Sequence, residues 1–430
     1  MSNIEIGGIA LVLSIVLIGF RLHVGVALAL SAIGGMIAII GTRGTMGVLK
    51  STPYEFSASW ELSAIPMFIL MGNVAYHTGM TDALFRAARL WLGRLPGGLA
   101  VASNFASAGF AAASGSSLAT VMSIGKIGIP EMLRYKYNPG MAGGVIAAAG
   151  NLGSLIPPSI LLVLYGIFAE QSITSLFTAA IVPGILTALV FAAMIMIRCW
   201  LNPSLAPVPD EQPSLREKME VLIHIWPLPL LVIGVMGSLY SGLTTATEAG
   251  ALGAFIAFVI ALVQGKLNRG AIRRALLETV YTSGSLFFIA MGAILMTRLM
   301  AFSGLPGYLS GQFTAADLSP VLLVVIVCLI YLVLGCVMDS MGMMLLTLPV
   351  MIPLFNAAGF DMIWFGIIVV KFVEIGMITP PLGINVFAVK TIMPDTPLGV
   401  LFRGVSWFLL CEIIVVALLC LFPIIVTFAI

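Results

Sequence analysis

Two short polar segments interrupt an otherwise apolar sequence, and both carry oxygen atoms that suit a cation. The first, residues 114–117, reads SGSS, and the second, residues 339–342, reads DSMG. Hard cations such as sodium take several oxygen ligands, which hydroxyls, carboxylates and backbone carbonyls supply. The alternative for each segment taken alone is that small residues simply let helices pack closely.

A pair of adjacent prolines lies downstream of each polar segment. Residues 151–160 read NLGSLIPPSI, and residues 374–383 read EIGMITPPLG. Proline lacks an N–H and clashes with the preceding helical turn, so neither pair can continue a regular helix. Inside a bilayer, such non-helical backbone survives only where protein or a watery cavity satisfies its polar groups. Two broken helices are therefore predicted, over 141–168 and 362–389, with free carbonyls facing the polar segments.

An internal repeat relates the two sets of features. A shift of 223 residues aligns Ser117 with Ser340 and Gly153 with Gly376, and it superimposes the two proline pairs without a gap. The same shift aligns Asn151 with Glu374. Prolines and glycines that keep register over such a distance indicate a duplication, and paired helix breaks in two halves are typical of membrane transporters.

The composition excludes several classes of protein. With 60% hydrophobic residues, 9% charged residues and a mean hydropathy of +1.14 over 430 residues, the chain is an integral membrane protein with room for about ten spans. A net charge of +2 and the lack of a basic tract argue against nucleic acid as a partner. The sequence contains no Walker A motif and no catalytic triad pattern, so we expect neither ATP hydrolysis nor an enzyme. The cysteines, Cys336 among them, have no metal-type spacing.

The elements that must position these residues follow from hydropathy. The predicted fold is an all-α polytopic membrane protein in which an inverted repeat contains two re-entrant helical hairpins and two broken helices. The first repeat covers 1–200, with a surface helix near 82–94, a hairpin near 97–129 and the first broken helix. Residues 201–220 form a linker, and the second repeat covers 221–430, with a hairpin near 321–355. Connections are expected at 41–60, 266–274 and 303–319.

Charge fixes the orientation. Following the spans in order places 16 of the 20 Lys and Arg residues on one side, with Arg43, Lys50 and Arg298 towards the other. The positive-inside rule makes the richer side cytoplasmic. The first hairpin is therefore expected to enter from the cytoplasm and the second from the opposite face, with the linker in the cytoplasm.

Charged residues within spans need a partner or a task. Lys371 and Glu374 are three residues apart on one helical face, so they either neutralise each other or act directly on substrate or ion. Arg298 either extends to the membrane interface or meets an anion. Glu248, Glu278 and Glu412 are expected to make contacts at helix ends or between helices.

Four segments around the polar tips and the helix breaks resemble a known family. The segments ASGSSLATVMSIGKIGIPEM, AGNLGSLIPPSI, MDSMGMMLLTLPVMIPLF and EIGMITPPLGINVFAVK are similar to the large membrane subunit of tripartite ATP-independent periplasmic (TRAP) transporters. The resemblance covers essentially the whole chain. It implies the fold of the elevator-type ion transporter superfamily, a location in the bacterial inner membrane, and sodium-driven import of a carboxylate.

The resemblance also implies partners and a cargo. A soluble periplasmic binding protein and a small four-helix membrane subunit are expected, the latter as a separate chain because no extra four-helix segment is visible here. The expected coupling ion is Na⁺, with no other metal and no cofactor. Sialic acid is favoured as the substrate over a C4-dicarboxylate on overall resemblance.

Residue patterns and resemblance together give the candidate site. The residues predicted to bind sodium are Ser114, Gly115, Ser116, Ser117, Asn151, Gly153, Asp339, Ser340, Gly342, Gly376 and Thr379. Those predicted to bind substrate are Ser116, Ser117, Pro158, Ser340 and Pro381. Two other functions remain open: a sodium/carboxylate symporter that needs no binding protein, and a channel or non-transporting scaffold.

Overall fold

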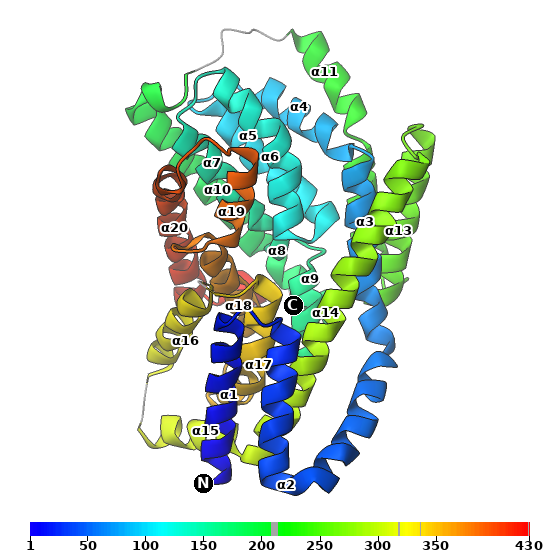
Figure 1. Ribbon diagram of the computed structural model, residues 1–430. Coiled ribbons are helices and arrows are strands. Elements are labelled where there is room, and N and C mark those ends of the chain that lie inside the picture. The colour runs from blue at the N-terminus through cyan, green and yellow to red at the C-terminus, as the bar shows by residue number, and fades with distance from the viewer. Residues whose placement is uncertain (208–213, 317–318, 336, 429) are drawn as a thin grey trace.

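The computed structural model describes residues 1–207, 214–316, 319–335, 337–428 and 430, and that part of the chain contains helices and no strand (Figure 1). Six helices are long and apolar enough to cross a membrane, or up to eight if each of two bent pairs is counted as one span. Cys336 and part of the predicted linker, 208–213, lie outside the described residues.

The chain begins with helices that lie in the lower part of the molecule and then climb towards its upper right in this view (Figure 1). They are α1 (Asn3–Gly19), α2 (Val24–Ser57), the short η1 (Trp60–Ser63) and α3 (Ala64–His77). The connection expected at 41–60 is largely helical, because α2 continues beyond a kink. Gly41 has φ 73° at that kink, and Thr45 Oγ1 donates to its carbonyl at 2.8 Å.

The first hairpin follows an amphipathic helix, α4 (Met80–Leu92), which occupies the position of the predicted surface helix. The hairpin consists of α5 (Gly98–Ser114) and α6 (Ser117–Arg134). The first broken helix comprises α7 (Pro139–Gly150), α8 (Leu152–Leu155) and α9 (Ile160–Ala169), which are bent by 41° across the proline pair. A long helix, α10 (Ile173–Leu201), ends this half.

The predicted linker is partly helical. After the 3₁₀ helix η2 (Pro203–Leu205), the helix α11 (Leu215–His224) begins within the range predicted as the linker. Its start is set by a capping box, in which the Ser214 hydroxyl accepts from Glu217 N–H at 3.2 Å and the Glu217 carboxylate accepts from Ser214 N–H at 2.7 Å. Then come α12 (Pro227–Tyr240) and α13 (Ala246–Val263), where Glu248 makes the expected helix-end contact with Thr245.

Two expected connections of the second half are helical. The basic loop expected at 266–274 is helical from Arg269 onwards, where the 35-residue α14 (Arg269–Ser303) begins, because Asn268 Oδ1 caps it by accepting from Ala271 N–H at 2.8 Å. The polar turn expected at 303–319 contains α15 (Leu305–Ala315). The second hairpin then forms from α16 (Pro320–Gly335) and α17 (Ser340–Ala357).

The last elements include the second broken helix, α18 (Met362–Ile378) and α19 (Ile384–Ile392), followed by α20 (Leu398–Leu421) and α21 (Ile424–Thr427). The two halves exchange contacts. The helix after the first break, α9, packs against α17 and α18 of the second half, and α19 packs against α6 and α7 of the first. The first hairpin lies in the upper half of the molecule and the second in the lower half (Figure 1). The predicted fold class is confirmed.

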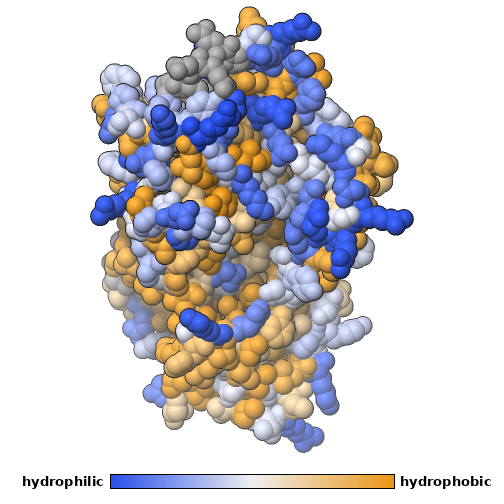
Figure 2. All heavy atoms as spheres, turned by 45° about the horizontal axis from the view of Figure 1, so that its top comes forward, coloured by the Kyte–Doolittle hydropathy of each residue, from blue (hydrophilic) through white to orange (hydrophobic). Residues whose placement is uncertain are grey.

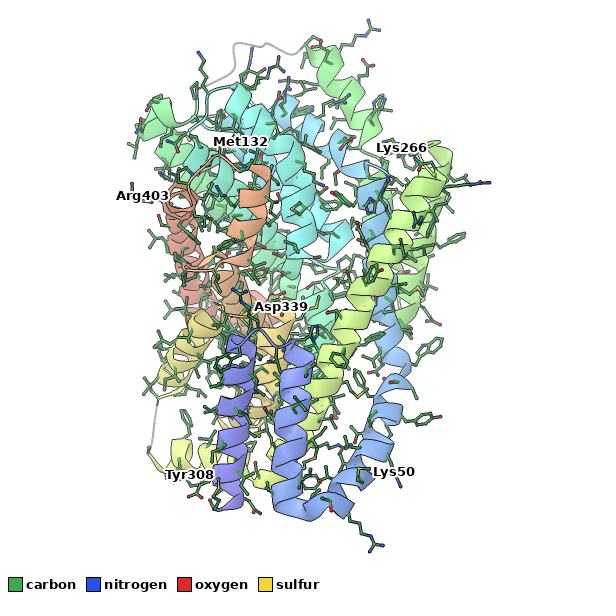
Figure 3. The ribbon with its side chains drawn as sticks, viewed as in Figure 1. Lys50, Met132, Lys266, Tyr308, Asp339 and Arg403 are labelled. Carbon is green, nitrogen blue, oxygen red and sulfur yellow. The ribbon has the colours of Figure 1, made fainter. Side chains whose placement is uncertain are left out.

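Polar and apolar residues are segregated over the surface. Hydrophilic residues gather over the end where α4 and α11 lie, and hydrophobic residues cover much of the opposite part in this view (Figure 2). Lys266 and Arg403 lie in the upper part and Lys50 at the lower end (Figure 3).

Candidate functional site

Both hairpin tips and both helix breaks border one cavity of about 400 Å³, called here the central cavity. The first hairpin contributes residues 115–118 and the second contributes residues 339–341. Residues beside the two breaks, together with one face of α14, complete the wall. The residues of the breaks and of α14 are Ser154, Ile160, Leu161, Met377, Ile384, Tyr281, Thr282, Ser285, Leu286 and Ile289. Segments more than 200 residues apart in sequence therefore meet at one cavity.

The first hairpin turns at Gly115, which has φ 59°, a left-handed conformation that favours glycine. The turn is tied to the first break, because Ile160 N–H donates to Gly115 O at 3.2 Å. A Cβ at position 115 would lie 2.6 Å from Pro158 O, so any larger residue would push the hairpin off the broken helix.

Three oxygens converge beside this turn. Thr120 Oγ1 donates to Ser116 O at 2.8 Å, and Ser114 Oγ lies 3.0 Å from Thr120 Oγ1. Gly153 of the broken helix faces the cluster so closely that a Cβ there would lie 2.5 Å from Ser116 O. Sequence reasoning missed Thr120, although it lies one turn after Ser116 and hence on the same helical face. The cluster consists of neutral oxygens only.

A buried amide that sequence reasoning also missed joins the two halves. Asn385 Nδ2 donates to Asn151 Oδ1 at 2.7 Å and to Ala147 O at 3.2 Å, while Ser117 Oγ lies 3.1 Å from Asn385 Oδ1. Asn385 follows the second break yet contacts the first hairpin. Asn151 in turn donates to Glu374 O at 2.9 Å, so the two residues that the repeat aligns are in direct contact.

The second hairpin presents a carboxylate to the cavity. Asp339 occupies the N-cap position of α17, and its backbone carbonyl accepts from Met343 N–H at 3.0 Å. A Cβ at Gly342 would lie 2.8 Å from Asp339 Oδ1, so glycine leaves room for the carboxylate over the first turn of the helix. Val24, just after the α1–α2 turn, packs against the same glycine, and that turn lies beside Asp339 in Figure 3.

The second break lies behind this tip. A Cβ at Gly335 would collide with the Gly376 Cα, which means that α16 and α18 approach each other through their backbones. Thr379 Oγ1 donates to Ile375 O at 2.6 Å, which leaves its lone pairs available.

The wall formed by α14 carries hydroxyl groups. His23 Nδ1 accepts from Gly25 N–H at 3.3 Å, so a neutral ring carries its proton on Nε2, which lies 3.3 Å from Ser285 Oγ. His23 therefore orients a hydroxyl of the cavity wall from behind. Nothing in the sequence pattern marked α14 as part of the site.

The predicted site residues thus fall into two groups. Five line the cavity: Gly115, Ser116, Ser117, Asp339 and Ser340. The others lie behind the tips or in the breaks: Ser114, Asn151, Gly153, Pro158, Gly342, Gly376, Thr379 and Pro381. Pro158 is buried, whereas Pro381 is exposed, so the breaks differ although their sequences match. Their assignment as ligands of sodium or substrate stays a prediction.

Five of the charged residues singled out in the sequence have ionic partners among the described residues. Lys371 Nζ lies 2.7 Å from Glu374 Oε2 and 2.5 Å from Glu412 Oε2, as expected if Lys371 and Glu374 neutralise each other, and Glu412 makes the expected contact between helices. Glu278 pairs with His77 at 2.8 Å. Arg298 is half-exposed and lies 3.8 Å from Glu55.

Sequence comparison decides the family. The sequence model of one protein family, the tripartite ATP-independent periplasmic transporter, DctM component, matches residues 11–425. The chain belongs to this family. It is therefore a transport protein rather than an enzyme, and a multi-pass protein of the bacterial inner membrane.

Individual relatives support this assignment. The chain is 35% identical to the C4-dicarboxylate TRAP transporter large permease protein DctM of Pseudomonas aeruginosa, over 85% of this chain and 87% of that protein. It is 32% identical to the sialic acid TRAP transporter large permease protein SiaM of Vibrio cholerae, over 85% of each. Its fold is similar to that of the YdaH transporter of Alcanivorax borkumensis, with a TM-score of 0.60, 16% identity and coverage of 88% of this chain and 89% of that one.

Proposed function

We propose that this TRAP large permease imports a carboxylate by sodium-coupled secondary transport, using the central cavity as its binding site. The observation that carries the proposal is the convergence of two hairpin tips and two helix breaks on one cavity of about 400 Å³. Binding at the interface of repeats, between broken helices, is the arrangement expected of a secondary transporter.

The charge of the cavity supports sodium coupling. Asp339 is the one charged residue among the described residues that line it, and no Lys or Arg is among them. An anionic substrate placed in such a cavity meets a like charge at close range, which is unfavourable in a poorly hydrated site. Bound cations would offset the negative charge of Asp339 and attract the anionic substrate. The substrate would then bind well only after sodium, which is the requirement for coupled transport.

Two cation positions fit the oxygens available. At the first hairpin, Ser114 Oγ, Ser116 O and Thr120 Oγ1 form a neutral set beside Gly153. At the second, the Asp339 carboxylate and the Ser340 hydroxyl adjoin the cavity. We expect the second position to bind sodium more tightly, because it alone includes a full negative charge.

We further propose that transport proceeds by an elevator movement. The hairpins and broken helices exchange contacts between halves and would move as one unit. The wall against which they would move includes α14, which packs along α2 and α3. Sodium and substrate would cross the membrane together with the hairpin tips.

The substrate we favour is sialic acid, with a C4-dicarboxylate as the second choice. Relatives of both kinds match the chain over similar lengths. A sugar acid brings one carboxylate and many hydroxyls to a cavity rich in serine and threonine hydroxyls, whereas a C4-dicarboxylate brings two negative charges that must be balanced. The partners we propose are a periplasmic binding protein that delivers the substrate and a small four-helix membrane subunit on a separate chain.

Reconstitution tests the proposal. Proteoliposomes containing the large subunit, the small subunit and the loaded binding protein should accumulate labelled substrate when an inward sodium gradient is applied. Uptake should stop when sodium is replaced by choline. Omitting the small subunit or the binding protein should stop it as well. The test uses sialic acid and succinate in parallel.

The competing functions predict different results. A symporter that needs no binding protein would accumulate substrate with the large subunit alone. A channel would equilibrate substrate without accumulation, and a scaffold would give no uptake under any condition. Accumulation that is unchanged in choline would refute sodium coupling while leaving the family assignment intact.

A further inference from the structure

A second polar cluster lies inside the protein, away from the wall of the central cavity. Lys371 and Glu374 on α18 and Glu412 on α20 have side chains that are 0% exposed. They contribute one positive and two negative charges if all three are ionised. One negative charge then remains unbalanced in the interior of a membrane-spanning unit, which is a costly arrangement.

The hydrogen bonds of the cluster also show that the two carboxylates lack donors. Lys371 Nζ donates to Glu374 Oε2 at 2.7 Å and to Thr187 Oγ1 at 3.2 Å, and it forms an ion pair with Glu412 Oε2 at 2.5 Å. Thr187 donates its own proton to Pro183 O at 2.8 Å. Three carboxylate oxygens, Glu374 Oε1 and both oxygens of Glu412, have no hydrogen-bond partner among the described residues.

Neighbouring helices offer no further countercharge. On α7, α8, α17 and α21 no described residue is titratable. Elsewhere Tyr165 on α9 donates to Met362 O, Tyr331 on α16 bonds to Thr347, and Arg198 on α10 stacks over Trp407. The other titratable residues on these helices are Cys199, Cys328, Lys390, Arg403, Cys411 and Cys420, and no described ion pair joins any of them to the cluster.

We propose that Glu374 and Glu412 form a proton-binding site that holds one proton between them at neutral pH. The proton removes the unbalanced charge, because the cluster then contains one carboxylate, one carboxylic acid and one ammonium group. It also supplies the O–H donor that the unpartnered oxygens lack. A carboxylate pair that shares a proton is the usual outcome when two acids are held close together away from water.

The site is linked to the first hairpin by hydrogen bonds that pass through the first helix break. Asn151, which contacts Asn385 and through it Ser117, donates to the backbone carbonyl of Glu374 at 2.9 Å. The proton would therefore travel with the unit that carries the hairpins. The inference does not depend on sodium coupling, since it rests on the charge and the hydrogen bonds of this cluster alone.

Infrared spectroscopy of the purified full-length chain in detergent tests the inference without any transport assay. A protonated carboxylic acid has a carbonyl band separate from those of carboxylates. Comparing protein with ordinary glutamate and protein with carboxyl-¹³C-glutamate assigns such a band to glutamate rather than to lipid or Asp339. The wild-type chain should show the band at neutral pH, and both Glu374→Gln and Glu412→Gln should lose it, because the remaining carboxylate is then neutralised by Lys371.

Glu278→Gln is the matched control, since Glu278 is half-exposed and paired with His77, and it should retain the band. Absence of the band from the folded wild-type chain would overturn the proposal, as would its persistence in both cluster variants. Spectra in sodium and in choline buffers separate a proton from a metal cation. A band that appears only in choline would mean that sodium fills the site, and it would equally overturn the proposal.

Discussion

Among individual residues, Asp339 has the greatest influence on the charge of the central cavity. We predict that Asp339→Ala and the shape-matched Asp339→Asn raise the sodium concentration needed for half-maximal uptake about tenfold or more, because a charged ligand contributes about 1.5–3 kcal/mol. The measurement is uptake against sodium concentration in the complete reconstituted system. Ser116→Ala provides the comparison, and its effect on the sodium concentration should be several times smaller. The substitution removes the hydroxyl, which accepts from Ala119 N–H at 3.5 Å, but it retains the backbone carbonyl, which accepts from Thr120 Oγ1 at 2.8 Å. Normal sodium dependence in Asp339→Asn would remove this residue from the site.

Asn385 supports a second prediction at this scale. Asn385→Ala removes the donor to Asn151 Oδ1 and Ala147 O and leaves these buried acceptors unsatisfied. We expect a loss of stability of about 1–3 kcal/mol per group left unpaired, visible as a lower melting temperature in detergent, together with weaker sodium-dependent uptake. Asn73→Ala is the control, because Asn73 makes a single side-chain bond, to Thr279 at 3.0 Å. Equal melting temperatures for the two variants would contradict the special role of Asn385.

At the scale of elements, the first hairpin and the first broken helix must approach closely for the site to form. Gly153→Ala places a Cβ 2.5 Å from Ser116 O, which is backbone and cannot move aside alone. We predict that this variant assembles but loses most of its uptake. Gly284→Ala on α14 is the control, since nothing lies within 4 Å of a Cβ there, and it should transport normally. Wild-type uptake by Gly153→Ala would show that the hairpin tolerates displacement from the break.

The hairpins and the breaks could be predicted from the sequence because adjacent prolines, with glycines and serines nearby, cannot continue a regular helix through an apolar segment. Prediction failed where the signal was ambiguous. The segment 303–319 looks like a polar turn, yet apolar residues such as Leu305 and Leu309 give α15 a packing face. The repeat identified Asn151 and Glu374 as equivalent positions. It gave no sign of Asn385, because the residue equivalent to Asn385 in the first half, Leu162, is apolar. The α14 wall could not be predicted, since its hydroxyls reach the cavity only through tertiary packing.

At the scale of the whole molecule, an elevator movement requires the second hairpin tip to leave the α1–α2 turn. Val24 Cγ2 lies 3.2 Å from the position of a Cβ at Gly342, close enough for an engineered disulfide. We predict that Val24→Cys with Gly342→Cys, in a chain without its native cysteines, loses on oxidation the uptake that its reduced form shows and regains it on reduction. The reduced double variant is the reference, because a Cβ at position 342 lies 2.8 Å from Asp339 Oδ1 and lowers uptake by itself. The experiment measures uptake and cross-linking in the same proteoliposomes.

A cross-link inside the proposed moving unit is the control. Gly125 on α6 and Ile146 on α7 are similarly close, with Ile146 Cγ2 lying 3.0 Å from a Cβ at Gly125. The pair Gly125→Cys with Ile146→Cys should therefore cross-link without stopping uptake. Continued transport by the fully cross-linked Val24 and Gly342 pair would mean that tip and turn stay together, and the elevator model would fail.

The length of α14 has a practical consequence for the lipid around the protein. Its 35 residues rise about 52 Å at 1.5 Å each, whereas the hydrocarbon layer of a bilayer is about 30 Å thick. The helix must therefore tilt or extend into the headgroups, and its first two turns carry Arg269, Arg273 and Arg274, which suit anionic lipid headgroups. Bilayer thickness and headgroup charge therefore influence the tilt of this helix. In a reconstitution with thin or uncharged lipid, the tilt of α14 differs from that in a thicker, anionic bilayer.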